Sequence, residues 1–254
     1  MLEIKIDKKV ATLTLNRPEI HNAFNAELIT EITKTLEDLK TKDVKVLVLT
    51  GAGKSFCAGA DLNWMSSMKT WSEEENFQDS KKMAKMFRTL NTMPMPVIAR
   101  VNGPALGGGS GLVACCDYVL AVETAMFGFT EARLGLLPAV ISPFVIAKIG
   151  ESHARAWFLS GERFSAAQAQ KMNLIHEIAP LDDLDEKLER VVMSFLQAGP
   201  QAAREAKELI FRVRVAQEVE DETCRKISKI RIGAEGQEGM RALLEKDKPK
   251  WVKA

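Results

Sequence analysis

The sequence predicts an α/β protein with parallel strands, because short apolar strands alternate with helical segments along the chain. Residues Val10–Leu15 alternate apolar and polar side chains before a turn, and Val44–Thr50 is a β-branched run closed by glycines, so each predicts a strand. Leucine and isoleucine at helical spacing predict an amphipathic helix over Ala26–Lys40. We expect a third strand at Pro96–Val101 and a mostly helical, methionine-rich stretch at Trp64–Asn91.

Beyond about Pro180 the pattern is helical only. Two apolar stripes at helical spacing predict helices that each bury one face, against the rest of the chain or against another subunit. The stripes are Leu184, Leu188, Val192 and Phe195, followed by Ala202, Ala206, Leu209 and Val213.

Composition limits the class of protein. The 254 residues are 46% hydrophobic and 27% charged, which is typical of a globular protein with one domain and an appendage. Lys and Arg (35) balance Asp and Glu (34), so no overall charge attracts nucleic acid or an anionic membrane. The start of the chain lacks a signal-peptide pattern, and glycine and prolines interrupt its most apolar stretch, Leu134–Ile149, so we expect a cytoplasmic protein. The cysteines show no pairing or metal-ligand spacing, which predicts reduced thiols: Cys57, Cys115, Cys116 and Cys224.

A glycine run within Asn102–Gly111 is the strongest chemical signal. Three consecutive glycines cost roughly 1 kcal/mol each in a helix relative to alanine, so a structural or chemical need should offset them. They fit a helix start whose free N–H groups face an anionic ligand, and they equally fit a tight turn with close packing. Leu112 stands where a dinucleotide motif needs its third glycine and where a nucleophile elbow needs its last one. We therefore interpret Ser110 as a packing residue.

Two further segments are candidates for the site. In Ser55–Leu62, small residues after a buried strand would let backbone N–H groups approach a ligand, although a plain loop with Asp61 as a helix cap looks similar. In Phe127–Pro138, Glu131 lies in an apolar context that would raise its pKa and suit it to proton transfer. The alternative is a structural ion pair between Glu131 and Arg133.

Four ordered motifs resemble the crotonase family, also called the enoyl-CoA hydratase/isomerase superfamily. Leu15–Pro18 with Asn22–Asn25 is similar to the family's opening motif, and Ala58–Leu62 to its first oxyanion segment. Asn102–Gly109 resembles the second oxyanion segment, and Glu238–Lys246 the terminal helix. The resemblance covers almost the whole chain.

The resemblance implies a crotonase-like ββα spiral core with a C-terminal helical trimerisation region, divided here at residues 1–195 and 196–254. It implies a homotrimer or hexamer that binds an acyl-CoA thioester, with no nucleic acid or membrane partner. The amides of Ala60 and Gly108 would hold the thioester oxygen in an oxyanion hole. No metal or redox cofactor is implied, because coenzyme A is part of the substrate. Contacts to coenzyme A or substrate are expected from His21, Ala23, Lys54, Ala58, Asp61, Leu62 and Asn63.

One family position is substituted. Hydratases of the family commonly carry two glutamates, and this chain has Gly111 at the first position and Glu131 at the second. A two-carboxylate hydration mechanism therefore lacks one acid. The segment Gly135–Phe144 resembles bacterial methylglutaconyl-CoA hydratase-type members, which act in leucine or isoprenoid breakdown, and this favours a short branched enoyl-CoA.

Three functions follow as hypotheses. The first is reversible hydration of a 2-enoyl-CoA, such as 3-methylglutaconyl-CoA, with Glu131 as acid and base. The second is isomerisation of 3-enoyl-CoA to 2-enoyl-CoA, for which one base suffices. The third is a non-catalytic CoA-thioester-binding or RNA-associated protein, against which the balanced charge and the retained Glu131 both argue. The acyl chain, the choice between trimer and hexamer, and a carboxylate-binding role for Arg133 stay open.

Overall fold

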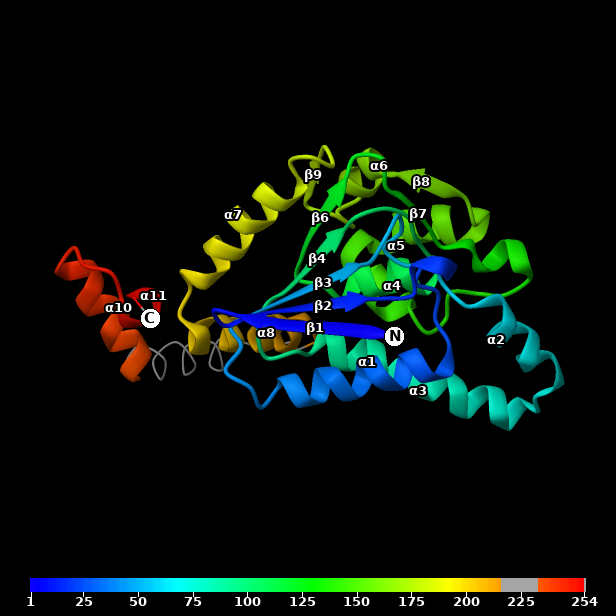
Figure 1. Ribbon diagram of the computed structural model, residues 1–254, viewed down its shortest axis with the longest axis horizontal. Helices are drawn as coiled ribbons and strands as arrows, with labels where there is room; N and C mark the ends of the chain where they lie inside the picture. The colour runs from blue at the N-terminus through cyan, green and yellow to red at the C-terminus, as the bar shows by residue number, and fades with distance from the viewer. Residues whose placement is uncertain (216–232, 254) are drawn as a thin grey trace.

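The computed structural model describes residues 1–215 and 233–253, and its centre is a six-stranded sheet (Figure 1). The strand order is β1-β2-β3-β4-β6-β9; β1 pairs antiparallel with β2, and every later pair is parallel. This confirms the predicted α/β class. The strands are β1 (Leu2–Asp7), β2 (Val10–Leu15), β3 (Val46–Gly51), β4 (Val97–Val101), β6 (Tyr118–Val122) and β9 (Glu177–Ala179).

A second, smaller sheet contains β5 (Ala105–Leu106), β7 (Met126–Gly128) and β8 (Arg163–Ser165). Isolated bridges extend it: Cys57 pairs with Ala105, and Phe24 pairs with Ala60. Successive turns of the chain thus add one strand to the large sheet and one short segment to the small one, which is the predicted ββα spiral. The consequence for the site is that segment 57–60 lies directly beside segment 105–108.

Helices cover both faces of the large sheet. Along β3, Leu47 and Leu49 belong to the main core with the helices α1, α3, α4 and α5, whereas Val46 and Val48 pack with Val191 of α7. The helices and 3₁₀ turns are η1 (Pro18–Ile20), α1 (Ala26–Leu39), α2 (Leu62–Ser67), η2 (Met68–Thr70), α3 (Glu73–Asn91), α4 (Gly108–Cys115), η3 (Thr130–Leu134), α5 (Ser142–Ser160), α6 (Ala166–Lys171), α7 (Leu184–Leu196), α8 (Pro200–Val215), α10 (Ala234–Leu244) and α11 (Lys250–Lys253).

The predicted strands and the long amphipathic helix are confirmed with boundaries shifted by at most two residues. The stretch Trp64–Asn91 is helical, but it breaks before α3, where Ser72 and Glu75 form a reciprocal capping box. The glycine run does begin a helix, because Gly107 is the N-cap of α4. The short strands β5, β7, β8 and β9 were not predicted, since two or three residues carry no measurable periodicity.

The two C-terminal apolar stripes differ in their environment. Leu184 and Val192 of α7 are buried as expected. On α8, in contrast, Ala202 and Ala206 are exposed and Val213 is 41% exposed, so this stripe is not covered within the described part of the chain. The contact of α8 with the core is polar: Lys207 Nζ lies 2.6 Å from Asp117 Oδ2.

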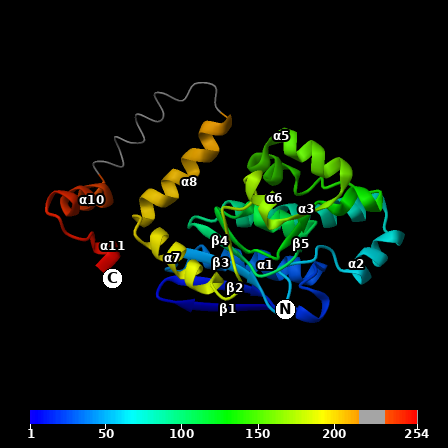
Figure 2. The same cartoon turned by 90° about the horizontal axis from the view of Figure 1, so that it is seen from above.

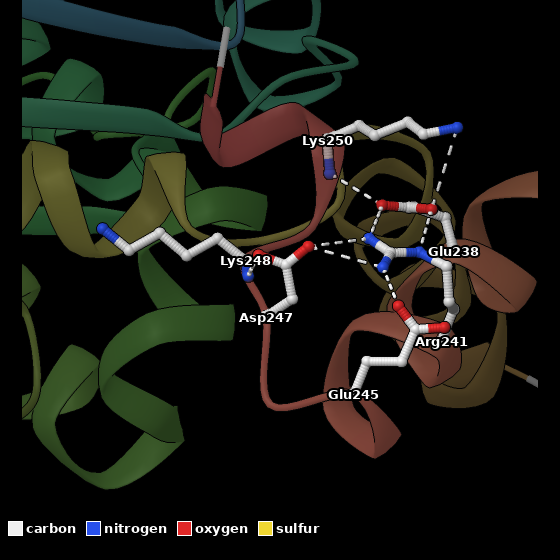
Figure 3. A network of polar contacts seen from close by, with 6 residues as sticks. All are labelled: Glu238, Arg241, Glu245, Asp247, Lys248 and Lys250. Carbon is white, nitrogen blue, oxygen red and sulfur yellow. Dashed lines mark hydrogen bonds and ion pairs between the residues drawn. The ribbon is translucent and has the colours of Figure 1, made fainter.

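The predicted helix at Glu238–Lys246 corresponds to α10, which begins earlier, at Ala234, ends at Leu244 and is followed by α11. Helices α10 and α11 lie at the end of the molecule opposite to α2 (Figures 1 and 2). A polar network joins them, in which the Arg241 guanidinium binds Glu238 through two hydrogen bonds of 2.8 and 2.9 Å and also reaches Glu245 (Figure 3). Arg241 lowers the pKa of Glu238 to about 2. The backbone amide of Lys250 also donates to Glu238, which fixes α11 against α10.

Within residues 1–215 and 233–253, no helix combines the length and the hydropathy that a bilayer span requires. Cys57, Cys115 and Cys116 are buried free thiols, and burial raises the pKa of Cys57 and of Cys116 to about 12. These two thiols are therefore not activated as nucleophiles. Cys224 lies outside the described residues.

Candidate active site

A cavity of about 860 Å³ opens beside the C-terminal ends of the two oxyanion segments. Its lining includes residues 58–60 and 106–108 together with residues from α2, η2 and α3. Residues 130–141, together with Gly161 and Arg163, complete the lining. The cavity thus joins the three segments that carry the predicted chemistry.

The amide of Ala60 is left unpaired by its neighbours. Phe24 N donates to Gly59 O at 2.7 Å, and Asp61 N donates to Phe24 O at 2.8 Å. These bonds fix the backbone on both sides of Ala60, and across the described chain no backbone hydrogen bond is donated by the Ala60 amide itself. Ala60 lines the cavity, so its N–H is a candidate ligand donor.

The amide of Gly108 is unpaired for a different reason. Gly108 is the first residue of α4, and the first N–H groups of a helix have no acceptor within it. The preceding Gly107 has φ of 51°, a left-handed conformation suited to glycine, and its N–H donates to Gly128 O at 2.9 Å. A Cβ on Gly108 would lie only 2.7 Å from the ring of Phe24, so a larger residue would displace that ring.

Backbone contacts hold the two amides close together. Leu106 N donates to Cys57 O at 2.9 Å, and Cys57 N donates to Pro104 O at 3.1 Å. Gly109 permits this approach, because a Cβ there would lie 2.2 Å from Cys57 O. The pairing of two short segments, rather than any side chain, therefore sets the separation of Ala60 and Gly108.

Glu131 brings its carboxyl group to the same place. It lies in η3, and its Oε1 is 3.4 Å from the position that a Cβ on Gly107 would occupy. Its Oε2 is enclosed and has no hydrogen-bond partner among the described residues. Burial raises the pKa of Glu131, against the opposing effect of a hydrogen bond to its own backbone amide.

The alternative interpretation of Glu131 as the ion-pair partner of Arg133 is wrong. Arg133 Nε donates to Ser160 O at 3.2 Å, and its Nη2 lies 3.6 Å from Glu162. Arg133 therefore turns toward the loop after α5, and no ion pair to the Glu131 carboxyl forms within residues 1–215 and 233–253. Ser110 fits its predicted packing role, because its buried hydroxyl donates to Ala105 O at 2.6 Å.

The position of the absent family acid is closed to any side chain. A Cβ on Gly111 would lie 2.4 Å from Ile141 Cγ2 and 3.0 Å from the ring of Phe87. Ile141 belongs to Gly135–Phe144, the segment that resembles methylglutaconyl-CoA hydratase-type members. Ile141 fills the space that a side chain at position 111 would need, so this segment and the absence of the family acid form one packing arrangement.

Hydrogen bonds from the opening motif, Leu15–Pro18 with Asn22–Asn25, hold the first oxyanion segment in position. Arg17 Nη1 donates to Ala23 O at 2.8 Å, and its Nη2 lies 3.2 Å from Asp61 Oδ2. The buried Asn22 amide donates to Ser55 O at 2.8 Å and to Ala52 O at 2.9 Å. The motif therefore has a structural task in placing Ala60, whatever it contributes to ligand binding.

The predicted coenzyme A contacts fall into two groups. Ala58 and the 80% exposed Leu62 line the cavity. The others do not: Asp61 caps α2 by accepting from Asn63 N at 2.8 Å, and Ala23 is buried. His21, Lys54 and Asn63 are exposed outside the cavity. Their contact with coenzyme A stays a prediction.

The cavity wall contains further polar side chains that the sequence did not single out: Trp64, Asn76, Asp79, Ser80 and Arg163. Trp64 Nε1 is enclosed without an acceptor in the described chain. Asp79 shares one face of α3 with Asn76 and Met83, and this helical spacing was the signal available in the sequence. Arg163 lies in a strand of three residues, for which no such signal exists.

A ββα spiral with two unpaired amides and a buried carboxyl at one cavity defines the crotonase class of proteins. The chain belongs to the enoyl-CoA hydratase/isomerase family, whose pattern it matches over residues 5–254. It is therefore an enzyme of that family, whose substrates are acyl-CoA thioesters.

Individual relatives agree with this assignment. The 2,3-dehydroadipyl-CoA hydratase of Escherichia coli is 36% identical over 226 residues, which cover 85% of this chain and 87% of that protein. An enoyl-CoA hydratase structure from Shewanella pealeana is 38% identical, with a TM-score of 0.95 over 98% of this chain and 95% of that one. Pseudomonas aeruginosa AtuE is 31% identical, with a TM-score of 0.96 over 99% of each chain. The names of the relatives favour hydratase over isomerase.

The packing at Gly111 leads to a prediction. Gly111→Glu should lower the free energy of unfolding by about 1 to 3 kcal/mol or more, because the new side chain overpacks against Ile141. Adding Ile141→Gly should recover much of that loss, with Ile141→Gly alone completing the cycle. Urea unfolding of the four proteins measures these effects. If Gly111→Glu is as stable as the wild type, position 111 is not closed.

Proposed function

We propose that the protein adds water reversibly to the α,β double bond of a 2-enoyl-CoA. The observation that carries the proposal is that the unpaired amides of Ala60 and Gly108 and the buried carboxyl of Glu131 line one cavity. Hydration needs a donor pair for the thioester oxygen and a group that moves protons near the double bond. These three residues supply both.

The two amides act on charge that develops during the reaction. When water attacks C3, the electron pair of the double bond moves toward the thioester, and negative charge grows on the thioester oxygen. Fixed N–H donors stabilise this enolate more than the neutral substrate, and each contributes roughly 3 to 4 kcal/mol in comparable sites. The N-terminus of α4 adds its dipole to the Gly108 donor.

Glu131 moves the proton. Its ionised carboxylate takes a proton from the attacking water as the oxygen bonds to C3, and its acid form returns the proton to C2 on the same face. One carboxyl group completes the cycle, so the closed position at Gly111 does not block it. Burial raises the pKa of Glu131, which stabilises the acid form that the cycle passes through.

Within the 2-enoyl-CoA class, the substrate that we propose is a short branched thioester such as 3-methylglutaconyl-CoA. This substrate would place the reaction in leucine degradation. The choice of substrate is supported by the segment Gly135–Phe144, which carries the resemblance to methylglutaconyl-CoA hydratase-type members and whose Ile141 lines the cavity. Two arginine side chains that could bind a substrate carboxylate line the cavity. Arg133 forms an ion pair with Glu162, whereas Arg163 forms no ion pair within the described residues. We therefore favour Arg163 over Arg133 for this contact. A cytoplasmic homotrimer or hexamer, assembled through residues 196–254, belongs to the same proposal.

Isomerisation of 3-enoyl-CoA to 2-enoyl-CoA is the second candidate. The observation in its favour is that position 111 has no room for the second family acid, because a proton shuttle between C4 and C2 needs one base and no bound water. A non-catalytic CoA-binding or RNA-associated role has no comparable support, since an unpaired buried carboxyl is costly to retain without a chemical use.

Removing the carboxylate tests the assigned base. Glu131→Gln should abolish turnover while acyl-CoA binding stays within a few fold of wild type, because the amides are untouched. In the wild type, kcat/KM should fall as the pH drops through a pKa above the ordinary 4.5, since only ionised Glu131 accepts the proton. Steady-state rates and calorimetric binding measure both effects, with Glu162→Gln as the control. Full activity in Glu131→Gln would remove Glu131 from the mechanism.

A substrate pair separates the two candidate reactions. The purified protein should convert 3-methylglutaconyl-CoA to the 3-hydroxy product, with one oxygen atom incorporated from ¹⁸O-labelled water. Conversion of only a 3-enoyl-CoA to its 2-enoyl isomer, without incorporation of label, would replace hydration by isomerisation. Mass spectrometry of the thioester products distinguishes the outcomes.

A further inference from the structure

Asp61 follows the oxyanion residue Ala60 and joins three parts of the chain. Its amide donates to Phe24 O at 2.8 Å. One oxygen of its carboxylate accepts from Asn63 N at 2.8 Å and thereby caps α2, and the other lies 3.2 Å from Arg17 Nη2. Asp61 itself is not among the residues that line the cavity. Any effect that Asp61 has on a ligand in the cavity must therefore pass through Ala60 or α2.

The two contacts of this side chain require a carboxylate. Serine or asparagine would cap α2 equally well, but each offers only one oxygen and leaves none for a cation. Arg17 also makes two contacts, because its Nη1 donates to Ala23 O at 2.8 Å while its Nη2 reaches Asp61. The planar fork of an arginine allows this, whereas a lysine has one nitrogen. The two side chains are only 14% and 12% exposed, so water screens their attraction weakly.

The Arg17 fork spans the backbone bridge that fixes Ala60. Ala60 pairs with Phe24 in this isolated bridge. The two residues that Arg17 contacts, Ala23 and Asp61, each adjoin one member of the pair. The guanidinium group therefore holds the two chain segments at a fixed separation on either side of the bridge.

The same bridge sets the direction of the Ala60 N–H. Gly59 O accepts from Phe24 N at 2.7 Å. The C=O and N–H of a planar trans peptide group point in opposite directions, so the Ala60 N–H points away from the Phe24 backbone. Gly59 has φ of 94°, a conformation that glycine exchanges readily for others. The hydrogen bond to Phe24 therefore fixes the orientation of this amide, and the separation of the two segments determines whether that bond forms.

We propose that Arg17 and Asp61 form a positioning pair for the amide of Ala60, and that Asp61 contributes to catalysis through this amide rather than through contact with coenzyme A. Without the pair, the two bridged segments separate, the amide loses its fixed orientation, and the enolate is stabilised less. The inference rests on the proposed function and deepens it by naming residues that determine the strength of its oxyanion hole.

Asp61→Ser separates the two tasks of the carboxylate, because serine still caps α2 but does not reach Arg17. The kcat for 3-methylglutaconyl-CoA should fall about tenfold to a hundredfold, as expected when one oxyanion donor is misplaced. The Kd of free coenzyme A, measured by calorimetry, should stay within about twofold of wild type, because the pair does not touch that ligand. Arg17→Met should have the same effect, and the double variant should be no slower than either single one.

An enolate that does not react measures the Ala60 donor without turnover. Acetoacetyl-CoA ionises to an enolate whose ultraviolet absorbance reports its pKa, and the Glu131→Gln background removes the competing base. Asp61→Ser should raise the pKa of the bound compound by about one unit relative to the Glu131→Gln parent, which is about a tenfold loss of enolate stabilisation. Arg17→Lys keeps the charge but not the fork, so it should raise this pKa by about half as much. If Asp61→Ser does not fold, Arg17→Lys and Arg17→Met provide the same measurement.

Asp117→Ser is the matched control. The Asp117 carboxylate also accepts from one backbone amide and binds one cation, Val97 N at 2.7 Å and Lys207 Nζ at 2.6 Å, but Asp117 lies outside the cavity lining. Asp117→Ser should lower the melting temperature by about 2 to 8 °C, as Asp61→Ser does, because each loses one ion pair. It should leave kcat and the pKa of bound acetoacetyl-CoA unchanged.

The proposal is overturned if Asp61→Ser leaves the pKa of bound acetoacetyl-CoA unchanged, if it weakens binding of free coenzyme A by as much as it lowers kcat, or if Asp117→Ser has the same effect on that pKa. Each of these results defeats this inference alone. Failure of the Glu131→Gln parent to lower the pKa of acetoacetyl-CoA below its value in water would defeat the oxyanion hole and the proposed function as well.

Discussion

The site depends on the backbone pairing of two short segments, 57–60 and 105–108. Cys57 and Ala105 form the bridge between them, and glycines at 59 and 109 remove the side chains that would hold them apart. This contact decides where the amides of Ala60 and Gly108 lie. Because the donors are backbone groups fixed by the fold, they need no reorganisation when charge develops on a ligand, which is the main source of their catalytic value.

Other parts of the molecule stabilise the pairing of these two segments or place further groups beside it. Arg17 and Asn22 form hydrogen bonds that hold the first segment in place, and α4 begins at the second segment, so that Gly108 at its start lines the cavity. The side chains around this frame are free to differ. Ile141 occupies the space next to Gly111, and the Glu131 carboxyl lies beside Gly107 in the second segment. The proposed hydration needs only the two backbone amides and one carboxyl group that accepts and returns a proton.

Much of this arrangement was predictable from the sequence, for identifiable reasons. Periodicity over six or more residues predicted β2, β3 and α1. Ordered motifs pointed to Ala60 and Gly108, and the apolar context of Glu131 together with the family resemblance pointed to its carboxyl; all three residues line the cavity. The pairing of Arg133 with Glu162 was not predictable, because it joins residues brought together only by the turn after α5. Asp79 was missed because helical spacing shows which residues share a face, and only the packed structure shows that this face borders a cavity. The assembly role of residues 196–254 remains a prediction.

The stretching frequency of a bound thioester carbonyl measures the oxyanion hole directly. A 2-enoyl-CoA with a ¹³C-labelled thioester carbonyl, bound to Glu131→Gln so that turnover stops, can be followed by isotope-edited infrared difference spectroscopy. Donation from the Ala60 and Gly108 amides should polarise the carbonyl and shift its stretch to lower frequency than in water. A frequency equal to or above that of the free thioester would contradict the account, since it would mean that the two amides do not reach the oxygen.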